Sequence, residues 1–280
     1  MKTPQPEYLL YATLLDSYSD YIHSDIIYSE YWGFSNNPPF SEDEFREKKR
    51  LDLINRINRV PMKWEDSEKA DRGTAFNEIV DCIIAGKKSD KMEIKKIFTT
   101  YTEMLDAENK RYEEVETNRL SAIEATYNNR TFTFPISVCK EFANYLKCAI
   151  SQVHTEAILQ TKYGDVLLYG YIDELMPASV HDIKTTGKYK AGKFKRNWQH
   201  VVYPYCLNKN GCKISNFEYN ILLIGKGTYE TFVEHYNYVP ETDITRLAAH
   251  VEAFIEFIEA NRDVITDLKI FNKHSTNDGT

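Results

Sequence analysis

Cysteine is scarce in this 280-residue sequence, long apolar runs are missing, and there is no excess of positive charge. The five cysteines form no CxxC pair and are odd in number, which fits a reducing compartment and predicts a cytoplasmic protein. No apolar run approaches the ~20 residues that a membrane-spanning helix needs, so we expect no membrane partner. Residues 1–6 lack the apolar stretch of a signal peptide, so we expect no secretion.

The charge balance is acidic, with 35 Lys and Arg against 42 Asp and Glu and a formal net charge of −7. This balance argues against a protein whose whole surface coats nucleic acid. It leaves room for a local basic groove, because electrostatic attraction depends on where the charges lie as well as on their sum.

Apolar and aromatic residues are plentiful. A hydrophobic fraction of 42%, with 20 Tyr and 14 Phe, is enough for a substantial core and excludes intrinsic disorder. The length allows one large domain or two small ones. Because the sequence has neither an interdomain linker nor an internal repeat, we predict a single domain over residues 1–280.

The pattern of apolar and turn residues predicts an α/β (α+β) fold with a core at 67–240. Before the core we expect a helical region at 1–66, and after it a C-terminal helix and tail at 241–280. Residues 87–150 are charged, and we predict that they form a mostly helical insertion. Helices are predicted at 41–60, 68–85, 196–208 and 242–261, and strands at 155–163, 166–175, 179–186, 216–224 and 229–239.

A predicted hairpin brings two carboxylates together. If residues 176–179 form a four-residue turn, Asp173 faces Asp182 on the neighbouring strand, and Lys184 projects from the same face. Two opposed carboxylates repel each other unless something neutralises them, and a divalent cation such as Mg²⁺ or Mn²⁺ suits hard oxygen ligands. The alternative is a solvent-facing hairpin with an ordinary Asp–Lys pair.

Two helices carry further polar candidates. Gln199 and Tyr203 are four residues apart, so they share one face of the helix at 196–208. Glu78 lies on the otherwise core-facing helix at 68–85, where an unpaired buried charge would be costly.

Taken in order, these residues resemble the motifs of the PD-(D/E)XK nuclease superfamily, in the branch of RecB-type nuclease domains, Cas4-type proteins and phage exonucleases. The resemblance covers residues 70–240 and lies in four motifs: Gly73-Thr74…Glu78, Gly170…Asp173, Asp182-Ile183-Lys184 and Gln199…Tyr203. It implies a restriction-endonuclease-like core, with a central mixed β-sheet flanked by helices. It also implies a bacterial or phage-encoded deoxyribonuclease dependent on Mg²⁺ or Mn²⁺.

The resemblance assigns roles residue by residue. Asp173 and Asp182 match metal-binding acids, Lys184 matches the catalytic lysine, and the carbonyl of Ile183 matches a further metal ligand. Gln199 and Tyr203 match residues that orient the lysine and contact DNA. For the first-motif ligand we choose Glu78 and keep Asn77 in reserve, because many relatives have His at the position of Asn77.

Some properties of the branch are not expected here. Relatives that hold an iron–sulfur cluster use four cysteines, three of them close to the C-terminus, whereas this chain has none beyond Cys212. We therefore expect no such cluster. The expected partners are DNA and a recombination or helicase protein, and the expected role is exonuclease action in DNA recombination, repair or phage DNA processing.

A basic segment follows the predicted metal site and contains no acid. We predict that it contacts DNA phosphates, although a solvated loop would have the same composition. Its cations after Lys184 are Lys188, Lys190, Lys193, Lys195 and Arg196. Two alternative functions stay open: a non-catalytic nucleic-acid-binding protein that retains the fold, and a metal-dependent enzyme acting on another substrate.

Overall fold

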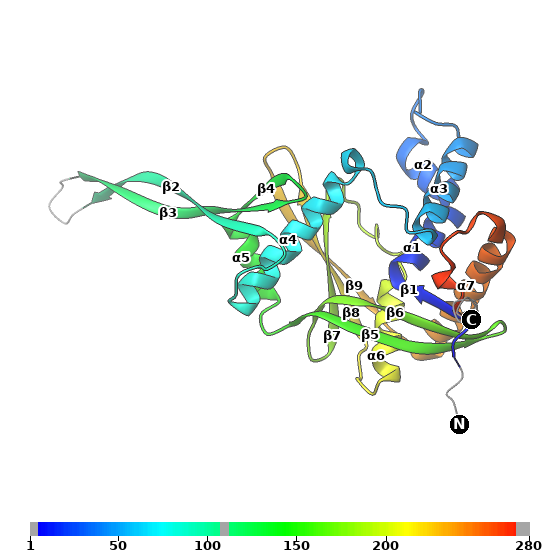
Figure 1. Ribbon diagram of the computed structural model, residues 1–280. Helices are drawn as coiled ribbons and strands as arrows, with labels where there is room; N and C mark the ends of the chain where they lie inside the picture. The colour runs from blue at the N-terminus through cyan, green and yellow to red at the C-terminus, as the bar shows by residue number, and fades with distance from the viewer. Residues whose placement is uncertain (1–4, 107–111, 273–280) are drawn as a thin grey trace, which may run out of the picture.

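A six-stranded mixed sheet forms the centre of the computed structural model, which describes residues 5–106 and 112–272 (Figure 1). The neighbouring strands β1, β6, β7, β8 and β9 follow one another across the sheet, and β5 pairs with β6. The β7–β8 and β1–β6 pairs are parallel, and the other pairs are antiparallel. The strands are β1 (Tyr8–Tyr11), β5 (Ile150–Thr161), β6 (Gly164–Leu175), β7 (Ser179–Thr186), β8 (Asn216–Ile224) and β9 (Tyr229–Asn237).

Helices cover both faces of this sheet. Helix α4 packs against β7 from one side with α5 beside it, while α6 lies on the other face against β5 and β6. Helices α1 and α7 pack on α6, and α2 and α3 complete an N-terminal helical group. The helices are α1 (Ala12–Ile22), α2 (Ser24–Trp32), α3 (Glu42–Ile57), α4 (Glu68–Ala85), α5 (Ile136–Tyr145), α6 (Gln199–Lys209) and α7 (Pro240–Ala260). The predicted mixed α/β class, with helices flanking a central mixed sheet, is confirmed.

Alternate side chains of the sheet pack into two separate hydrophobic cores. Ile221 of β8 packs into the core shared with α1, α6 and α7, whereas Leu222, next in the chain, packs with α4 and α5. Successive strand side chains point to opposite faces, so a fully buried sheet carries apolar residues at consecutive positions. The catalytic candidates therefore lie on a sheet that is covered on both sides.

The predicted helical insertion at 87–150 is wrong. The strands β2 (Glu93–Asp106), β3 (Tyr112–Tyr127) and β4 (Arg130–Pro135) form an antiparallel sheet, and among the described residues of 87–150 only α5 is helical. The β2–β3 ribbon extends away from the body of the molecule (Figure 1). Its Glu and Lys residues favour helix intrinsically, but cross-strand pairing overrides this preference.

The other predicted elements are present with small shifts of their ends. Helix α3 starts at Ser41, whose side chain accepts from Glu44 N while the Glu44 carboxylate accepts from Ser41 N, as in a capping box. Helix α4 ends at Gly86, which takes the left-handed conformation (φ 63°) that glycine adopts without strain. Strands β7 and β8 match the predicted ranges at both ends.

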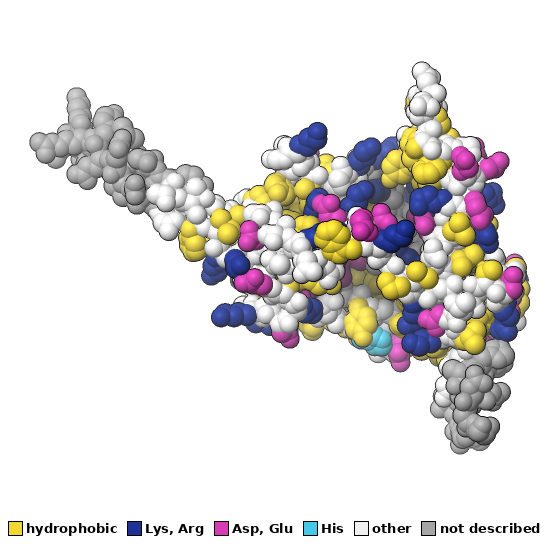
Figure 2. Space-filling model, turned by 45° about the horizontal axis from the view of Figure 1, so that its top comes forward, with side chains coloured by type: hydrophobic (Ala, Val, Ile, Leu, Met, Phe, Trp, Pro, Cys, Tyr) yellow, Lys and Arg dark blue, Asp and Glu magenta, His cyan; other side chains and the backbone are white. Residues whose placement is uncertain are grey.

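The N-terminal helices stand beside the rest of the molecule across a hollow. Residues of α2 and α3 line one side of it, and residues of α4 and the end of β7 line the other. Figure 2 shows this hollow near the middle of the view, with Lys and Arg side chains along it. Within the described part of the chain, no helix is both long and apolar enough to cross a membrane.

The packing of the α4–α5 core predicts that two phenylalanines contribute very differently to the free energy of unfolding. Phe76 is fully buried between Phe134 and Phe142, whereas Phe98 on the β2–β3 ribbon is 53% exposed. We expect Phe76→Ala to lower the free energy of unfolding by about 3–5 kcal/mol, because it leaves a cavity. Phe98→Ala should change it by less than about 0.5 kcal/mol. Urea denaturation of both variants measures this, and equal losses would contradict the assigned packing.

Candidate functional site

The predicted β6–β7 hairpin is present in the predicted register. Glu174 pairs with His181 and Leu175 with Val180 around a turn closed by a Met176 N to Ser179 O hydrogen bond of 2.9 Å. The ladder stops there. One residue further on, the carboxylate of Asp173 accepts a hydrogen bond from Ile183 N at 3.0 Å and so satisfies the backbone where the two strands part.

A buried polar network lies on β7 and the first turn of α6. Lys184 Nζ is 2.7 Å from Asp182 Oδ2 and donates to Gln199 Oε1 at 2.9 Å. Gln199 Nε2 in turn donates to Asp182 Oδ1 at 2.9 Å. Asp182 and Gln199 are 2% and 3% exposed. Because Gln199 contacts both charges, its amide fixes the position of the lysine relative to the carboxylate.

Tyr203 completes the shared helix face predicted with Gln199. Its hydroxyl accepts from Gln199 Nε2 at 3.4 Å, and its ring is buried. The ring lies so close to β6 that a Cβ at Gly170 would be 2.7 Å from Tyr203 Cε1. Packing therefore requires a glycine at position 170, three residues before Asp173, because any side chain there would collide with the Tyr203 ring.

The choice of Glu78 as first-motif ligand is not supported, because Asn77 is the residue that contacts Asp173. Asn77 Nδ2 lies 3.3 Å from Asp173 Oδ2. Glu78 accepts instead from Ser89 at 2.7 Å and pairs with Lys91 at 2.8 Å. Burial would raise its pKa, but these partners outweigh burial and lower it. Glu78 is thus a paired structural carboxylate.

A glycine marks the face of α4 that reaches the site. A Cβ at Gly73 would be 3.1 Å from Thr185 Oγ1, so this face of α4 lies against β7. Asn77 and Asp81 follow at intervals of four residues and share that face. The sequence therefore contained a signal in favour of Asn77: its spacing from the glycine.

A second pair of acids lies behind the first and was missed by sequence reasoning. Glu174 is fully buried, accepts from Ser151 Oγ at 2.9 Å and shares a hydrogen bond with Asp81. Burial and the neighbouring Asp81 raise the pKa of Glu174 to about 9, so this pair retains a proton at neutral pH. The Asp81 pKa is raised as well, mainly by burial.

Asp16 of α1 is another residue that the motifs did not indicate. Its carboxylate accepts a hydrogen bond from the backbone N of Trp198, directly before Gln199. Burial raises the Asp16 pKa to about 7, although the Trp198 hydrogen bond and Lys184 oppose the shift. Ala12 and Ser19 are buried on the same helix, three and four residues away, so an acid within a buried stripe was the available signal.

The charges at the centre of the site influence one another. Burial and the nearby Asp182 raise the pKa of Asp173 to about 7, against the effect of Lys184. Burial alone would lower the pKa of Lys184, but Asp182 and Asp173 outweigh it and raise this pKa. Lys184 is therefore positively charged at neutral pH and is suited to stabilising negative charge.

The donor set suits a divalent cation, although it contains few acids. Two buried oxygens, Asn77 Oδ1 and Asp182 Oδ2, accept no hydrogen bond from any described residue, although Asp182 Oδ2 pairs with Lys184. Carboxylate, amide and carbonyl oxygens are the ligands that Mg²⁺ and Mn²⁺ prefer. Within residues 5–106 and 112–272, no three His, Cys, Asp or Glu side chains form a metal-binding group. A cation here would therefore use Asp173, Asp182, the Asn77 amide and the Ile183 carbonyl.

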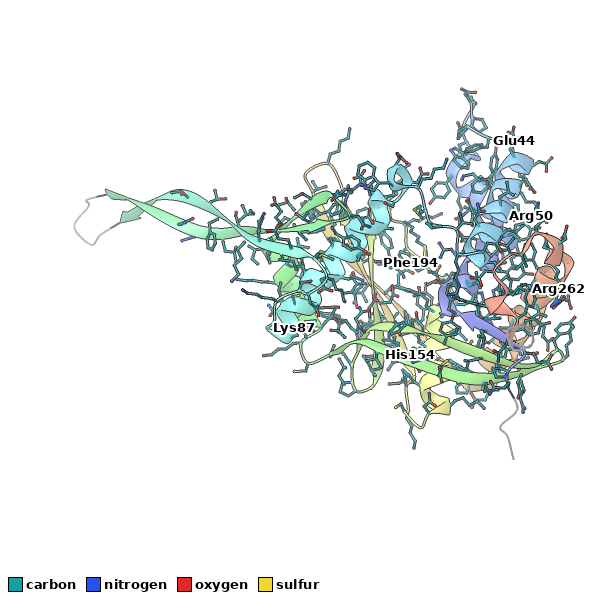
Figure 3. The ribbon with its side chains drawn as sticks, in the orientation of Figure 1. Glu44, Arg50, Lys87, His154, Phe194 and Arg262 are labelled. Atoms are coloured by element: carbon teal, nitrogen blue, oxygen red, sulfur yellow. The ribbon has the colours of Figure 1, made fainter. Side chains whose placement is uncertain are left out.

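The basic segment after β7 is folded into a compact loop. Lys193 Nζ donates to Thr186 Oγ1 at 2.5 Å and to the Lys188 carbonyl, and Arg196 pairs with Glu30 at 2.8 Å. Phe194, labelled in Figure 3 between α4 and the N-terminal helices, is buried and stacks on Tyr219. The exposed cations of this loop are Lys188, Lys190 and Lys195.

Comparisons with known proteins add little. No family model matches the chain, and no curated protein matches it. A solved structure described as "Crystal structure of SSO0001" gives a TM-score of 0.39 at 9% sequence identity, covering 90% of this chain and 79% of that chain. A likeness at this TM-score supports no inference about fold or function.

The contact between Asn77 and Asp173 predicts which α4 residue matters for metal binding. We expect Asn77→Ala to weaken Mg²⁺ binding about tenfold or more, because an oxygen ligand is lost. Glu78→Gln, a change away from Asp173, should weaken it less than threefold. Isothermal titration with Mg²⁺ measures both affinities, and a larger effect of Glu78→Gln would restore the original choice.

The Glu174–Asp81 pair predicts a pH dependence of stability. The pKa of Glu174 is higher in the folded protein than the unfolded value of about 4.3, so the folded state binds more protons in this range. The contribution of this shared proton to stability is therefore fully present below about pH 4 and is lost as pH rises toward about 9, by at most about 1.4 kcal/mol per pH unit for one proton. Glu174→Gln should flatten this fall. Urea denaturation from about pH 5 to pH 9 measures it, and parallel curves for wild type and variant would contradict the shared proton.

Proposed function

We propose that this protein is a metal-dependent deoxyribonuclease that hydrolyses phosphodiester bonds, acting as an exonuclease in recombination, repair or phage DNA processing. The observation that carries the proposal is the buried network in which Gln199 holds both Lys184 and Asp182 beside Asp173. Buried ionic groups are costly, and a protein gains little stability from such an arrangement. A function in binding and hydrolysing a phosphodiester explains why these groups are assembled here.

Each residue has a distinct role in this proposal. Asp173, Asp182, Asn77 and the Ile183 carbonyl would hold Mg²⁺ or Mn²⁺, which polarises a phosphate oxygen and lowers the pKa of a bound water. Lys184 is charged and would stabilise the negative charge that develops on the phosphate. Gln199 positions Lys184, and Tyr203 positions Gln199.

The arrangement of elements supports a restriction-endonuclease-like core. Helix α4, the strands β5 to β7, the crossover helix α6 and the parallel strand β8 follow one another in the chain and enclose the site. The candidate residues come from the strand end of β6, from β7 and from the facing turns of α4 and α6. We propose DNA as the substrate, a recombination or helicase protein as a partner, and the cytoplasm as the location.

One observation favours a second candidate, a non-catalytic nucleic-acid-binding protein. The first-motif position beside Asp173 holds the neutral Asn77, which leaves only two carboxylates around the proposed cation. A neutral amide cancels none of the cation's charge. The test below separates the two candidates, because only an enzyme shortens DNA.

The proposed mechanism predicts the outcome of a cleavage assay. With Mg²⁺, the wild-type protein should shorten linear DNA and leave circular DNA intact, and excess EDTA should stop it. Asp182→Asn should lower the rate by about 10³-fold, because the metal and Lys184 together contribute several kcal/mol to the transition state. Lys87→Gln, at an exposed residue beyond α4, is the matched control. Cleavage of linear DNA by Asp182→Asn at the control rate would refute the assignment, and so would its absence in the wild type.

A further inference from the structure

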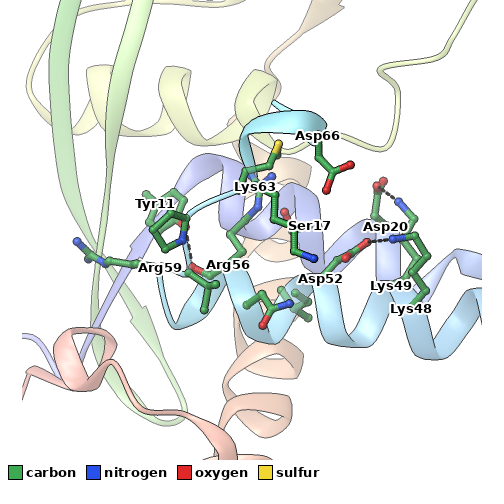
Figure 4. Close-up of a pocket in the computed structure, with 15 residues that line it drawn as sticks. Tyr11, Ser17, Asp20, Lys48, Lys49, Asp52, Arg56, Arg59, Lys63 and Asp66 are labelled. Carbon is green, nitrogen blue, oxygen red and sulfur yellow. Dashed lines mark hydrogen bonds and ion pairs between the residues drawn. The ribbon is translucent and has the colours of Figure 1, made fainter. Parts of the chain in front are cut away.

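The N-terminal helices form one wall of a cleft whose other end reaches the candidate site. One hollow of about 820 Å³ lies between α1, α3 and the segment after α3, whose residues are shown in Figure 4. A second, of about 700 Å³, lies between α2, α3, α4 and the end of β7. Lys48, Lys49 and Asp52 of α3 line both hollows, so α3 joins them into one cleft.

This cleft is strongly basic in an acidic protein. The whole chain carries a formal charge of −7. Among the residues that line the two hollows, the acids are Asp20, Asp52 and Asp66, and the bases are Lys48, Lys49, Arg56, Arg59, Lys63, Lys69, Arg72, Lys188 and Lys193. Positive charge is therefore gathered on this face, which is the electrostatic feature of a polyanion-binding groove.

Local ion pairs do not cancel this excess. Lys49 pairs with Asp20 at 2.7 Å and Lys48 with Asp52 at 3.5 Å (Figure 4), and two further bases pair with acids outside the lining, Arg59 with Asp267 at 3.0 Å and Arg72 with Glu68. Five lining bases then have no carboxylate partner among the described residues: Arg56, Lys63, Lys69, Lys188 and Lys193. Lys69 and Lys193 face the same hollow, and among the described residues neither forms an ion pair with a carboxylate. Burial lowers the pKa of Lys193 and the positive charge of Lys69 lowers it further, although Glu234 opposes the shift. A phosphate between them would relieve this repulsion.

The cleft ends next to the candidate site, whose own residues Asp173, Asp182 and Lys184 are not among those that line the two hollows. Thr185, Thr186 and Gly187, which line it, follow Lys184 in the chain. Arg72 lines the opposite side, next to Gly73, whose added Cβ would be 3.1 Å from Thr185 Oγ1. A strand of DNA lying in the cleft would therefore reach the end of β7, beside Asp182 and Lys184.

Aromatic side chains on the α2 wall indicate which form of DNA fits. Tyr31 is 54% exposed at the cleft and contacts Trp32, whose ring packs edge-on against Phe45. In a duplex the bases stack on one another, so only unpaired bases can stack on such a ring. A basic groove with an exposed aromatic platform is the combination that binds single strands.

We propose that this cleft binds single-stranded DNA and directs it to the Asp173–Asp182 site, an inference that rests on the proposed nuclease function for its substrate. Lys48, Arg56 and Lys69 contact phosphates, and Tyr31 stacks on a base. The N-terminal helical region is then the substrate-binding part of the molecule. Duplex DNA and acidic proteins lack the unpaired bases that Tyr31 would recognise.

Binding measurements test this without any need for cleavage. Fluorescence anisotropy of a labelled oligo-dT strand is measured with the full-length Asp182→Asn protein in Mg²⁺, over a range of salt concentrations. Replacing Lys48, Arg56 and Lys69 by Gln should weaken binding about 10- to 100-fold at 0.1 M salt and reduce the slope of log affinity against log salt by about 2. The control replaces Lys87, Lys147 and Lys213, which are exposed elsewhere, and should change neither quantity.

A second variant tests the aromatic platform. Tyr31→Ala should weaken single-strand binding about 5- to 150-fold, as expected for a lost base stack, while Tyr31→Phe should bind normally. Duplex of the same sequence should bind more weakly than the single strand, and Tyr31→Ala should not affect it. Equal losses in the cleft and control triples, or tighter binding of duplex than of single strand, would overturn the proposal. Binding through the cleft without cleavage by the wild type would support the cleft and refute the nuclease function.

Discussion

The buried ion pair between Asp182 and Lys184 is the constraint on which the site depends. The two residues are two positions apart on β7 and share one face of a covered sheet, where a charge without a partner would cost several kcal/mol. Gln199 satisfies both groups from α6, and Tyr203 supports Gln199 from the next turn. Gly170 leaves the space that Tyr203 fills. The packing of α6 on the sheet is thus adjusted to this one polar contact.

Much of the site could be predicted from sequence because its elements are local. A four-residue turn sets the β6–β7 register, and helical spacing sets the shared face of Gln199 and Tyr203. The α4 residue that contacts Asp173 was harder to predict, because Asn77 and Glu78 differ by about 100° around the helix and both lie beside apolar positions. Glu78 is buried, as its neighbours suggested, but its partners are Ser89 and Lys91 from the segment after α4. Such partners cannot be inferred from helical periodicity.

The remaining errors also arise from pairing and contacts that the periodicity of the sequence does not show. The β2–β4 sheet is stabilised by pairing between strands rather than by the preferences of its residues, so its Glu- and Lys-rich sequence resembled helix. Strand β1 is only four residues long and pairs with β6 more than 150 residues later. Asp16 joins the site through the backbone of Trp198, a contact 182 positions away in sequence.

These distant contacts also place the N-terminal region where it can act. Helix α1 is fixed to α6 by Asp16 and to α7 by the aromatic cluster of Tyr18 with Phe254. Helix α3 packs on α1, so the basic residues of α3 are attached to the body of the molecule through α1. The same helices that cover the core therefore supply the charged wall of the cleft.

We propose that Asp173 and Asp182 hold a divalent cation beside Lys184. An anomalous difference map from crystals of the protein soaked in Mn²⁺ tests this. We expect a peak between the two carboxylates, within coordination distance of the Asn77 amide oxygen and the Ile183 carbonyl. A fully occupied Mn²⁺ elsewhere in the molecule, with none at this position, would contradict it.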